Sequence, residues 1–299
     1  MLRHGLLKGS YIPDKDQREL RELVRYRKSL VNERSREVNR LDKVLQGANI
    51  KLSSVATDIM GVSGRAMLEG LLDDIEDTKV LAGLAKGRLK SKIEDLERAL
   101  NGIIGNHQKL LITSQLEHMD FLTQKIEILN QEISKRMLPF EEDLEILDSI
   151  PGIARRGAEE ILAEIGTDMS RFPTAAHLSS WAGMSPGNHE SAGRRKSGKT
   201  NKGNKALRTA LVEAANAASH TKNTYLAAKY HRLAARRGKN RAAVAIGHSI
   251  LVSIYHLLIT RQMYKDLGAN HIDNSKKQIA IRRYIKTLES LGVNVRIVS

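Results

Sequence analysis

Residues 14–46, DKDQRELRELVRYRKSLVNERSREVNRLDKVLQ, decide the architecture of the chain. Leucine and valine recur in this stretch mostly at three- and four-residue steps, from Leu20 to Leu45. This spacing places apolar side chains along one face of an α-helix. Asp14 or Asp16 can cap the first turn, and a glycine follows the last residue of the pattern. The stretch therefore predicts one long amphipathic helix with a charged outer face.

A second stretch, residues 107–138, repeats this pattern and is followed by a proline. Two such helices favour an antiparallel coiled coil, although two helices of an ordinary bundle would show the same spacing. Between them, residues 53–104 predict shorter helices that are interrupted by glycines. Residues 1–138 are therefore expected to form a helical, coiled-coil region that drives homo-oligomer formation.

The composition agrees with an all-α fold class. The chain has 299 residues, of which 41% are hydrophobic, only 4% are aromatic and five are proline, which favours long helices over sheet. It has no cysteine, and this excludes disulfides and thiolate zinc sites. We expect no signal peptide and no transmembrane helix, because the N-terminus lacks an apolar run and we find no stretch of about 18 uncharged apolar residues. A cytoplasmic protein without a membrane partner is the expectation.

The charge balance points to a polyanionic partner. The formal net charge is +15, and residues 214–265 contain no acid but nine lysines and arginines, among them Arg236 and Arg237. Such an excess is typical of proteins that bind nucleic acid, although a basic protein without such a partner is the alternative. We expect one strongly positive face in the C-terminal half.

The segment GRRKSGKT, residues 193–200, matches the phosphate-loop pattern of nucleoside triphosphatases. That loop needs a buried strand before it and a helix directly after it, and the surrounding sequence predicts neither. We interpret residues 185–204 as a flexible basic loop on a nucleic-acid backbone, with a solvated surface loop as the alternative. The predicted phosphate contacts are Arg194, Arg195, Lys196, Lys199, Lys202 and Lys205.

Residues 144–166, LEILDSIPGIARRGAEEILAEIG, have the pattern helix, Pro-Gly turn, helix. In a helix–hairpin–helix element, amides at the start of the second helix bind a DNA phosphate. Gly152 would form the turn, and Arg155 and Arg156 would meet the phosphate. Ala154 stands where such hairpins usually carry a second glycine. The alternative is a plain helical hairpin in a core. We assign residues 139–270 to one C-terminal domain and residues 271–299 to a tail.

Three segments carry a resemblance to a known family: DIMGVSGRAMLEGLL, DSIPGIARRGAEEILAEIG and FPTAAHLSSWAGMSPGNHESAGRRKSGKTNKGNKALRTALVEAA. They closely resemble the insertion-sequence transposases of the IS110, IS116 and IS902 group, which are DEDD-type, serine-dependent recombinases guided by a bridging RNA. The resemblance runs from Met1 to Ser299. It implies DNA and a structured guide RNA as partners, and a DNA-binding transposase domain after the coiled coil.

The resemblance also implies the site residues. The family's His-x-Ser-x-Gly motif falls on His189, Ser191 and Gly193, which makes Ser191 the candidate nucleophile and Ser197 the runner-up. The family's four metal-binding acids lie in a ribonuclease-H-like domain that precedes the segment resembling LRHGLLKGSYIP. We therefore expect an N-terminally truncated chain with no metal site or cofactor of its own, Mg²⁺ being expected only with that domain.

From the resemblance we expect a DNA transposase or recombinase that cuts and transfers strands through a serine and is incomplete as given. The alternative is a non-catalytic nucleic-acid-binding and dimerisation module that regulates a full-length transposase. Either function would retain the serine.

Overall fold

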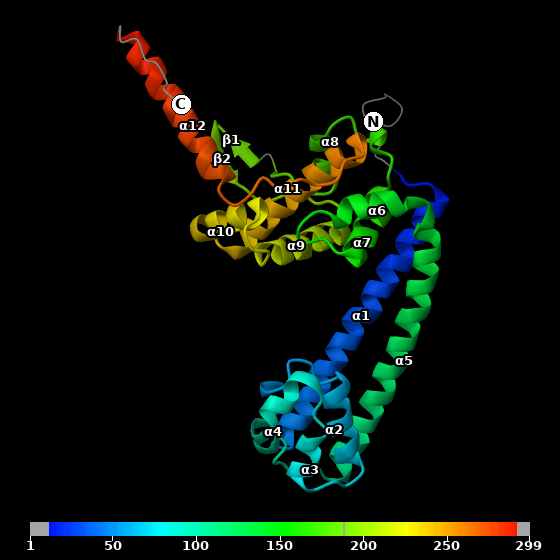
Figure 1. The fold of residues 1–299 in the computed structure, drawn as a ribbon. Helices are drawn as coiled ribbons and strands as arrows, with labels where there is room; N and C mark the ends of the chain where they lie inside the picture. Colours follow the sequence, from blue (N-terminus) through cyan, green and yellow to red (C-terminus); the bar gives the residue numbers. More distant parts are fainter. Residues whose placement is uncertain (1–11, 188, 292–299) are drawn as a thin grey trace. The chain divides into compact units, whose positions relative to one another are not determined.

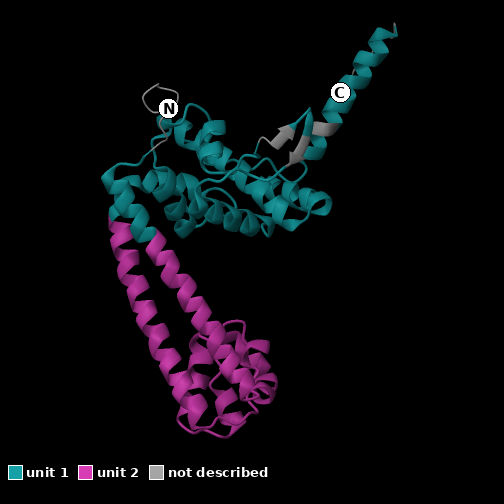
Figure 2. Cartoon of the chain, turned by 180° about the vertical axis from the view of Figure 1, so that it is seen from behind, with its two compact units in different colours: residues 1–24, 136–299 teal, residues 25–135 magenta. Residues whose placement is uncertain are grey.

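The computed structural model describes residues 12–187 and 189–291, and almost all of its regular structure is helical (Figure 1). The predicted all-α fold class is confirmed. The contacts divide the chain into two compact units (Figure 2). One comprises residues 1–24 and 136–299, and the other comprises residues 25–135. Two long helices pass through the boundary between the units.

These two helices are α1 (Lys15–Gly47) and α5 (Asn106–Met137), within a residue of the predicted ranges at either end. Within residues 25–135 they lie antiparallel, because Leu30 of α1 packs against Leu122 and Ile126 of α5, whereas Leu41, later in α1, shares a core with Ile112, earlier in α5. Arg34 Nε, one turn further along α1, donates to Thr123 Oγ1 at 2.9 Å. The apolar seam read from the sequence is therefore the seam along which the helices pack.

The unit of residues 25–135 closes around short helices. They are η2 (Leu52–Ser54), α2 (Val62–Leu72), α3 (Thr78–Gly83), η3 (Gly87–Lys92) and α4 (Ile93–Ala99). Their core with α1 and α5 includes Leu41, Leu45, Leu52, Met67, Leu81, Leu96, Ile112 and Met119. Glycines bound several of these elements as predicted, but Gly64 lies inside α2. A Cβ at Gly64 would stand 2.2 Å from the carbonyl oxygen of Ile59, so a close backbone approach requires that glycine.

The other unit contains the remaining elements. They are η4 (Leu138–Phe140), α6 (Glu141–Asp148), α7 (Arg155–Ile165), η5 (Met169–Arg171), α8 (Ala175–Trp181), β1 (His189–Ser191), β2 (Arg194–Ser197), α9 (Lys205–Ser219), α10 (Tyr225–Arg237), α11 (Lys239–Thr260) and α12 (His271–Ser290). The sequence predicted α6 and α7 but not α8 or α10. Residues 271–290 of the predicted tail form α12.

Helix α11 is the centre of this unit and packs against α6, α8, α9 and α10. Ile246, Ile250 and Ile254 on it are fully buried. It is also the one helix in the described residues that is long and apolar enough to cross a membrane, with a mean hydropathy of 1.9 over its apolar window. This corrects the expectation that no segment is long and apolar enough. Half of that window is buried inside the structure. The core helix of a folded domain can be equally long and apolar, so length and composition alone do not make α11 a membrane span.

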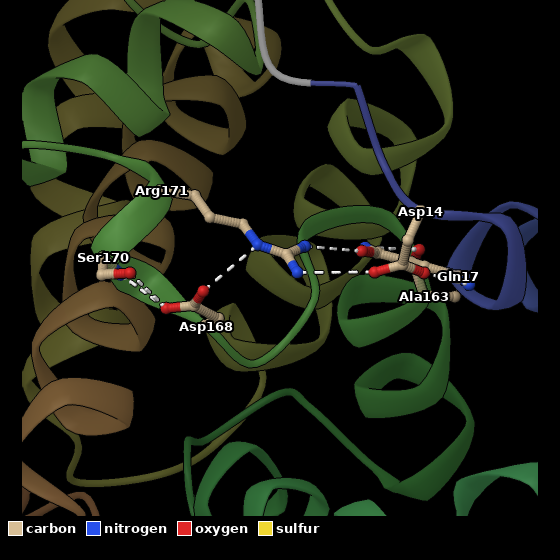
Figure 3. A network of polar contacts seen from close by, with 6 residues as sticks. All are labelled: Asp14, Gln17, Ala163, Asp168, Ser170 and Arg171. Atoms are coloured by element: carbon tan, nitrogen blue, oxygen red, sulfur yellow. Dashed lines mark hydrogen bonds and ion pairs between the residues drawn. The ribbon is translucent and has the colours of Figure 1, made fainter.

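A polar network fixes the first turn of α1 within the same unit (Figure 3). The Arg171 guanidinium contacts Gln17 Oε1 at 3.1 Å, Asp14 at 3.4 Å and Asp168 at 3.2 Å. Gln17 Nε2 donates to the carbonyl oxygen of Ala163 at 3.3 Å. Asp14 accepts the backbone N–H of Gln17 at 2.9 Å, so it caps the helix. The network ties α1 to the end of α7.

Candidate nucleic-acid interface

Strands β1 and β2, with the bridged residues Pro186 and Thr200 at their base, form a β-hairpin within residues 185–204, so the predicted flexible loop is corrected to paired strands. Strand β1 pairs antiparallel with β2, with a register shift between His189 and Glu190. The pairing continues toward the base of the hairpin, where the Gly187 N–H donates to the carbonyl oxygen of Lys199 at 2.8 Å. The next helix begins only at Lys205. This hairpin is therefore not the strand–loop–helix that a nucleotide-binding phosphate loop requires.

The tip of the hairpin is a two-residue turn. Ala192 and Gly193 both have positive φ, 51° and 70°. Positive φ at both central residues is the conformation whose twist matches paired strands. Glycine adopts it freely, whereas alanine there costs about 1 kcal/mol. The turn fixes the residues on either side of it, so that Ser191 lies opposite Arg194 in the ladder.

The predicted nucleophile Ser191 is thus the last residue of β1, and both Ser191 and Arg194 are exposed. Arg195, Lys196 and Ser197 follow on β2. Their side chains, like that of His189, fall outside the part of the structure that is described. The hairpin backbone therefore presents the serine at its tip, beside a run of basic residues.

The base of the hairpin is held by a close backbone crossing. A Cβ placed at Gly203 would stand 2.3 Å from the backbone nitrogen of Gly183. The next residue, Asn204, caps α9 by accepting the N–H of Leu207 at 3.1 Å, and its amide donates to Glu164 Oε2 at 2.6 Å. Glu164 is buried and pairs with Arg21 of α1 at 3.1 Å. These positioning residues could not be predicted from the sequence, because no local pattern marks their distant partners.

A groove of about 840 Å³ lies beside the base of the hairpin. It is lined by Met184, Pro186, Gly198, Lys199, Thr200, Arg208, Arg237, Asn240, Arg241, Val244, Ala245 and His248. Four of these residues are lysine or arginine and none is acidic. Burial, and secondarily the charge of Lys229, lower the pKa of His248, so that ring is neutral at pH 7 and the positive charge comes from the other four side chains.

Two of these groove residues, Lys199 and Arg237, were predicted from the sequence as nucleic-acid contacts, whereas Arg208, Arg241 and His248 were not. The acid-free stretch 214–265 was the signal for Arg241. No sequence pattern marked Arg208, because it lies on α9 before the acid-free stretch 214–265 and reaches the groove only through the fold. Its Nη1 donates to Thr200 Oγ1 at 2.6 Å.

Two helices, α6 and α7, joined by the Pro-Gly turn form a hairpin as the sequence pattern predicted, but the turn faces α9. Gly152 has a φ of 93°, and a Cβ there would stand 2.3 Å from the carbonyl oxygen of Ala214. Arg155 forms a two-point ion pair with Glu141, one contact being 2.8 Å, and lies 3.3 Å from Glu159. A phosphate at Arg155 would therefore compete with two carboxylates.

The other predicted contacts of the interface are open to solvent. Arg156 is exposed at the start of α7, Lys202 and Lys205 are exposed just after the hairpin, and Arg236 is exposed at the end of α10. Within the described ranges, no group of three or more histidines and acids could hold a metal ion. The DNA-binding roles of all these cations stay predictions.

Comparisons with known proteins agree with the sequence resemblance. Residues 144–232, from α6 into α10, match the family model described as the transposase IS116/IS110/IS902 family, and residues 1–50 match a second model described as transposase. The transposase for insertion sequence element IS1111A of Coxiella burnetii (strain RSA 493 / Nine Mile phase I) is 32% identical over 143 residues. The alignment spans 45% of this chain and 38% of that relative's length.

Proposed function

Because the chain belongs to the IS116/IS110/IS902 group of transposases, we propose that it binds DNA and cuts and rejoins DNA strands through Ser191. The observation that carries this proposal is the place of Ser191, exposed at the tip of a basic hairpin and opposite Arg194. An exposed hydroxyl next to the turn is open to an approaching phosphodiester.

The proposed reaction is covalent catalysis. Ser191 Oγ attacks the phosphorus and loses its proton, the bond from phosphorus to one deoxyribose oxygen breaks, and that oxygen gains a proton. The resulting phosphoserine conserves the bond energy for rejoining. Nearby cations stabilise the charge that develops on the phosphate oxygens. A serine hydroxyl also needs an activating partner. The family resemblance assigns that role to Mg²⁺ on the acids of the ribonuclease-H-like domain, and the described residues offer no such cluster.

The proposed nucleic-acid contacts are the turn residue Gly152 and the cations around the hairpin and at the α6–α7 and α10 ends: Arg155, Arg156, Arg194, Arg195, Lys196, Lys199, Lys202, Lys205, Arg236 and Arg237. Phosphate contacts of this kind position the duplex without reading its sequence. The proposal also includes a structured guide RNA, which would supply that sequence information. A homo-oligomer through the α1–α5 pair completes the proposed assembly.

The test is a covalent protein–DNA adduct, detected on a denaturing gel with labelled DNA and Mg²⁺. The chain is assayed alone and with the ribonuclease-H-like domain of a full-length family member. We expect the adduct with that domain, its loss in Ser191→Ala, and its retention in Ser197→Ala. DNA affinity of Ser191→Ala should stay within about twofold, because a hydroxyl contributes little beside several phosphate-binding cations.

Each other outcome has a distinct meaning. An adduct that survives Ser191→Ala and disappears in Ser197→Ala would show that Ser197, six residues further on, is the nucleophile. Salt-dependent DNA binding without any adduct, in every combination, would remove the catalytic proposal and leave a nucleic-acid-binding regulatory module.

A further inference from the structure

The arginines of the groove at the hairpin base differ from the arginines of their unit that form ion pairs. Several other arginines of this unit meet carboxylates: Arg21 meets Glu164, Arg155 meets Glu141 and Glu159, Arg171 meets Asp14 and Asp168, Arg232 meets Asp273, and Arg261 meets Asp143. In contrast, Arg208, Arg237 and Arg241 line one groove whose described lining contains no acid. Like charges brought together without a counter-charge repel one another, and an anion between them would relieve that repulsion.

The groove is also built to keep one of these cations in place. Thr200 of the hairpin accepts a hydrogen bond from Arg208, which uses one of the five N–H donors of that guanidinium. The α10–α11 junction brings Arg237 and Arg241 to the same groove from either side of Gly238. Three guanidinium groups from α9, α10 and α11 therefore converge beside the hairpin. Guanidinium forks suit phosphate oxygens in geometry as well as charge.

We propose that this groove binds the phosphodiester backbone of the same DNA strand that Ser191 attacks, through Arg208, Arg237 and Arg241. This inference rests on the proposed function and adds where the strand is held. Thr200, at the groove, lies five paired steps from Arg194, the partner of Ser191, along the β2 side of the hairpin, because the register shift takes up one of the six residues between them. At about 3.3 Å per residue this is about 17 Å, or about five nucleotides at the 3.4 Å spacing of duplex DNA. The groove holds the backbone about five nucleotides from the phosphate that reacts.

The test measures affinity for a labelled DNA duplex by fluorescence anisotropy across a range of salt concentrations. Each of Arg241→Ala, Arg237→Ala and Arg208→Gln should reduce the steepness of log affinity against log salt by about 0.9, the value for one lost phosphate contact. Lys239→Ala is the matched control, because Lys239 is an exposed cation at the same α10–α11 junction that does not line the groove. Arg241→Lys keeps the charge and should keep the slope. Thermal unfolding of each variant checks that it folds.

Groove variants that change the salt slope no more than Lys239→Ala does would overturn the groove inference while leaving DNA binding by the wild type intact. Wild-type chain that shows no salt-dependent DNA binding would instead overturn the proposed function itself. Variants that weaken binding of a structured RNA but not of the duplex would show that RNA occupies the groove, which also contradicts the inference. Phosphate ethylation interference supplies the spacing: a modified phosphate about five nucleotides from the adduct should block binding.

Discussion

At the scale of single residues, the hairpin depends on two glycines that meet through their backbones. Gly183 has a φ of 70°, and its backbone nitrogen occupies the space that a side chain at Gly203 would need. In the sequence, Gly203 indicates only that a helix is disfavoured directly after the basic segment 193–200. The close approach of Gly203 to Gly183, twenty positions earlier, cannot be predicted from the residues around either glycine.

Gly203→Ala should therefore destabilise the unit that carries the hairpin. The added methyl must displace backbone, and strain of this kind typically costs about 1–3 kcal/mol. Gly198→Ala is the matched control, because a Cβ at Gly198 meets nothing within 4 Å, and such surface changes stay within about 0.5 kcal/mol. Thermal unfolding of the two variants measures the difference. Equal melting temperatures would contradict the close crossing.

At the scale of elements, apolar spacing predicted the long helices almost to the residue, because α1 and α5 keep one apolar face over many turns. The hairpin could not be predicted in this way. Residues 189–197 are almost entirely polar, so they show no alternation of apolar and polar side chains. Backbone pairing and a turn with positive φ hold the hairpin, and the Ala-Gly of that turn is a weaker signal than Asn-Gly would be. The proposed nucleophile was assigned from the family resemblance, whereas the groove could be found only in the folded structure.

The α5 helix also bears on self-association. Phe121 and Ile128 lie seven residues apart and are 55% and 52% exposed, which is the spacing of a second apolar seam. Phe121→Glu with Ile128→Glu should shift the chain toward monomer in sedimentation, because charge at such a seam opposes association. Gln131→Glu, an exposed position on the same helix, should leave the assembly unchanged. A wild-type chain that sediments as a monomer at high concentration would refute association through this helix.

At the scale of the whole molecule, the excess of positive charge makes the carboxylates structurally important. The 34 acids partly offset 49 lysines and arginines. Hydrogen bonds from the Ser170 side chain and backbone, together with Arg171, lower the pKa of Asp168. The backbone N–H of Gln17 and Arg171 lower the pKa of Asp14, and Arg155 lowers the pKa of Glu141. These carboxylates stabilise the molecule only while they are ionised.

The sign of the resulting pH dependence follows from these lowered values. A carboxylate whose pKa is lower in the folded state adds stability above its unfolded pKa, near 4, and loses it as the pH falls through the folded pKa. We therefore expect the melting temperature to fall between pH 5 and pH 3, and the growing positive charge adds repulsion over the same range. Asp168→Asn should have a lower melting temperature than wild type at pH 7. The difference between the two melting temperatures should be smaller at pH 3, because the Asp168 carboxylate of the wild type is then protonated as well. A gap that stays constant with pH would show that the Asp168–Arg171 contact does not stabilise the fold through charge.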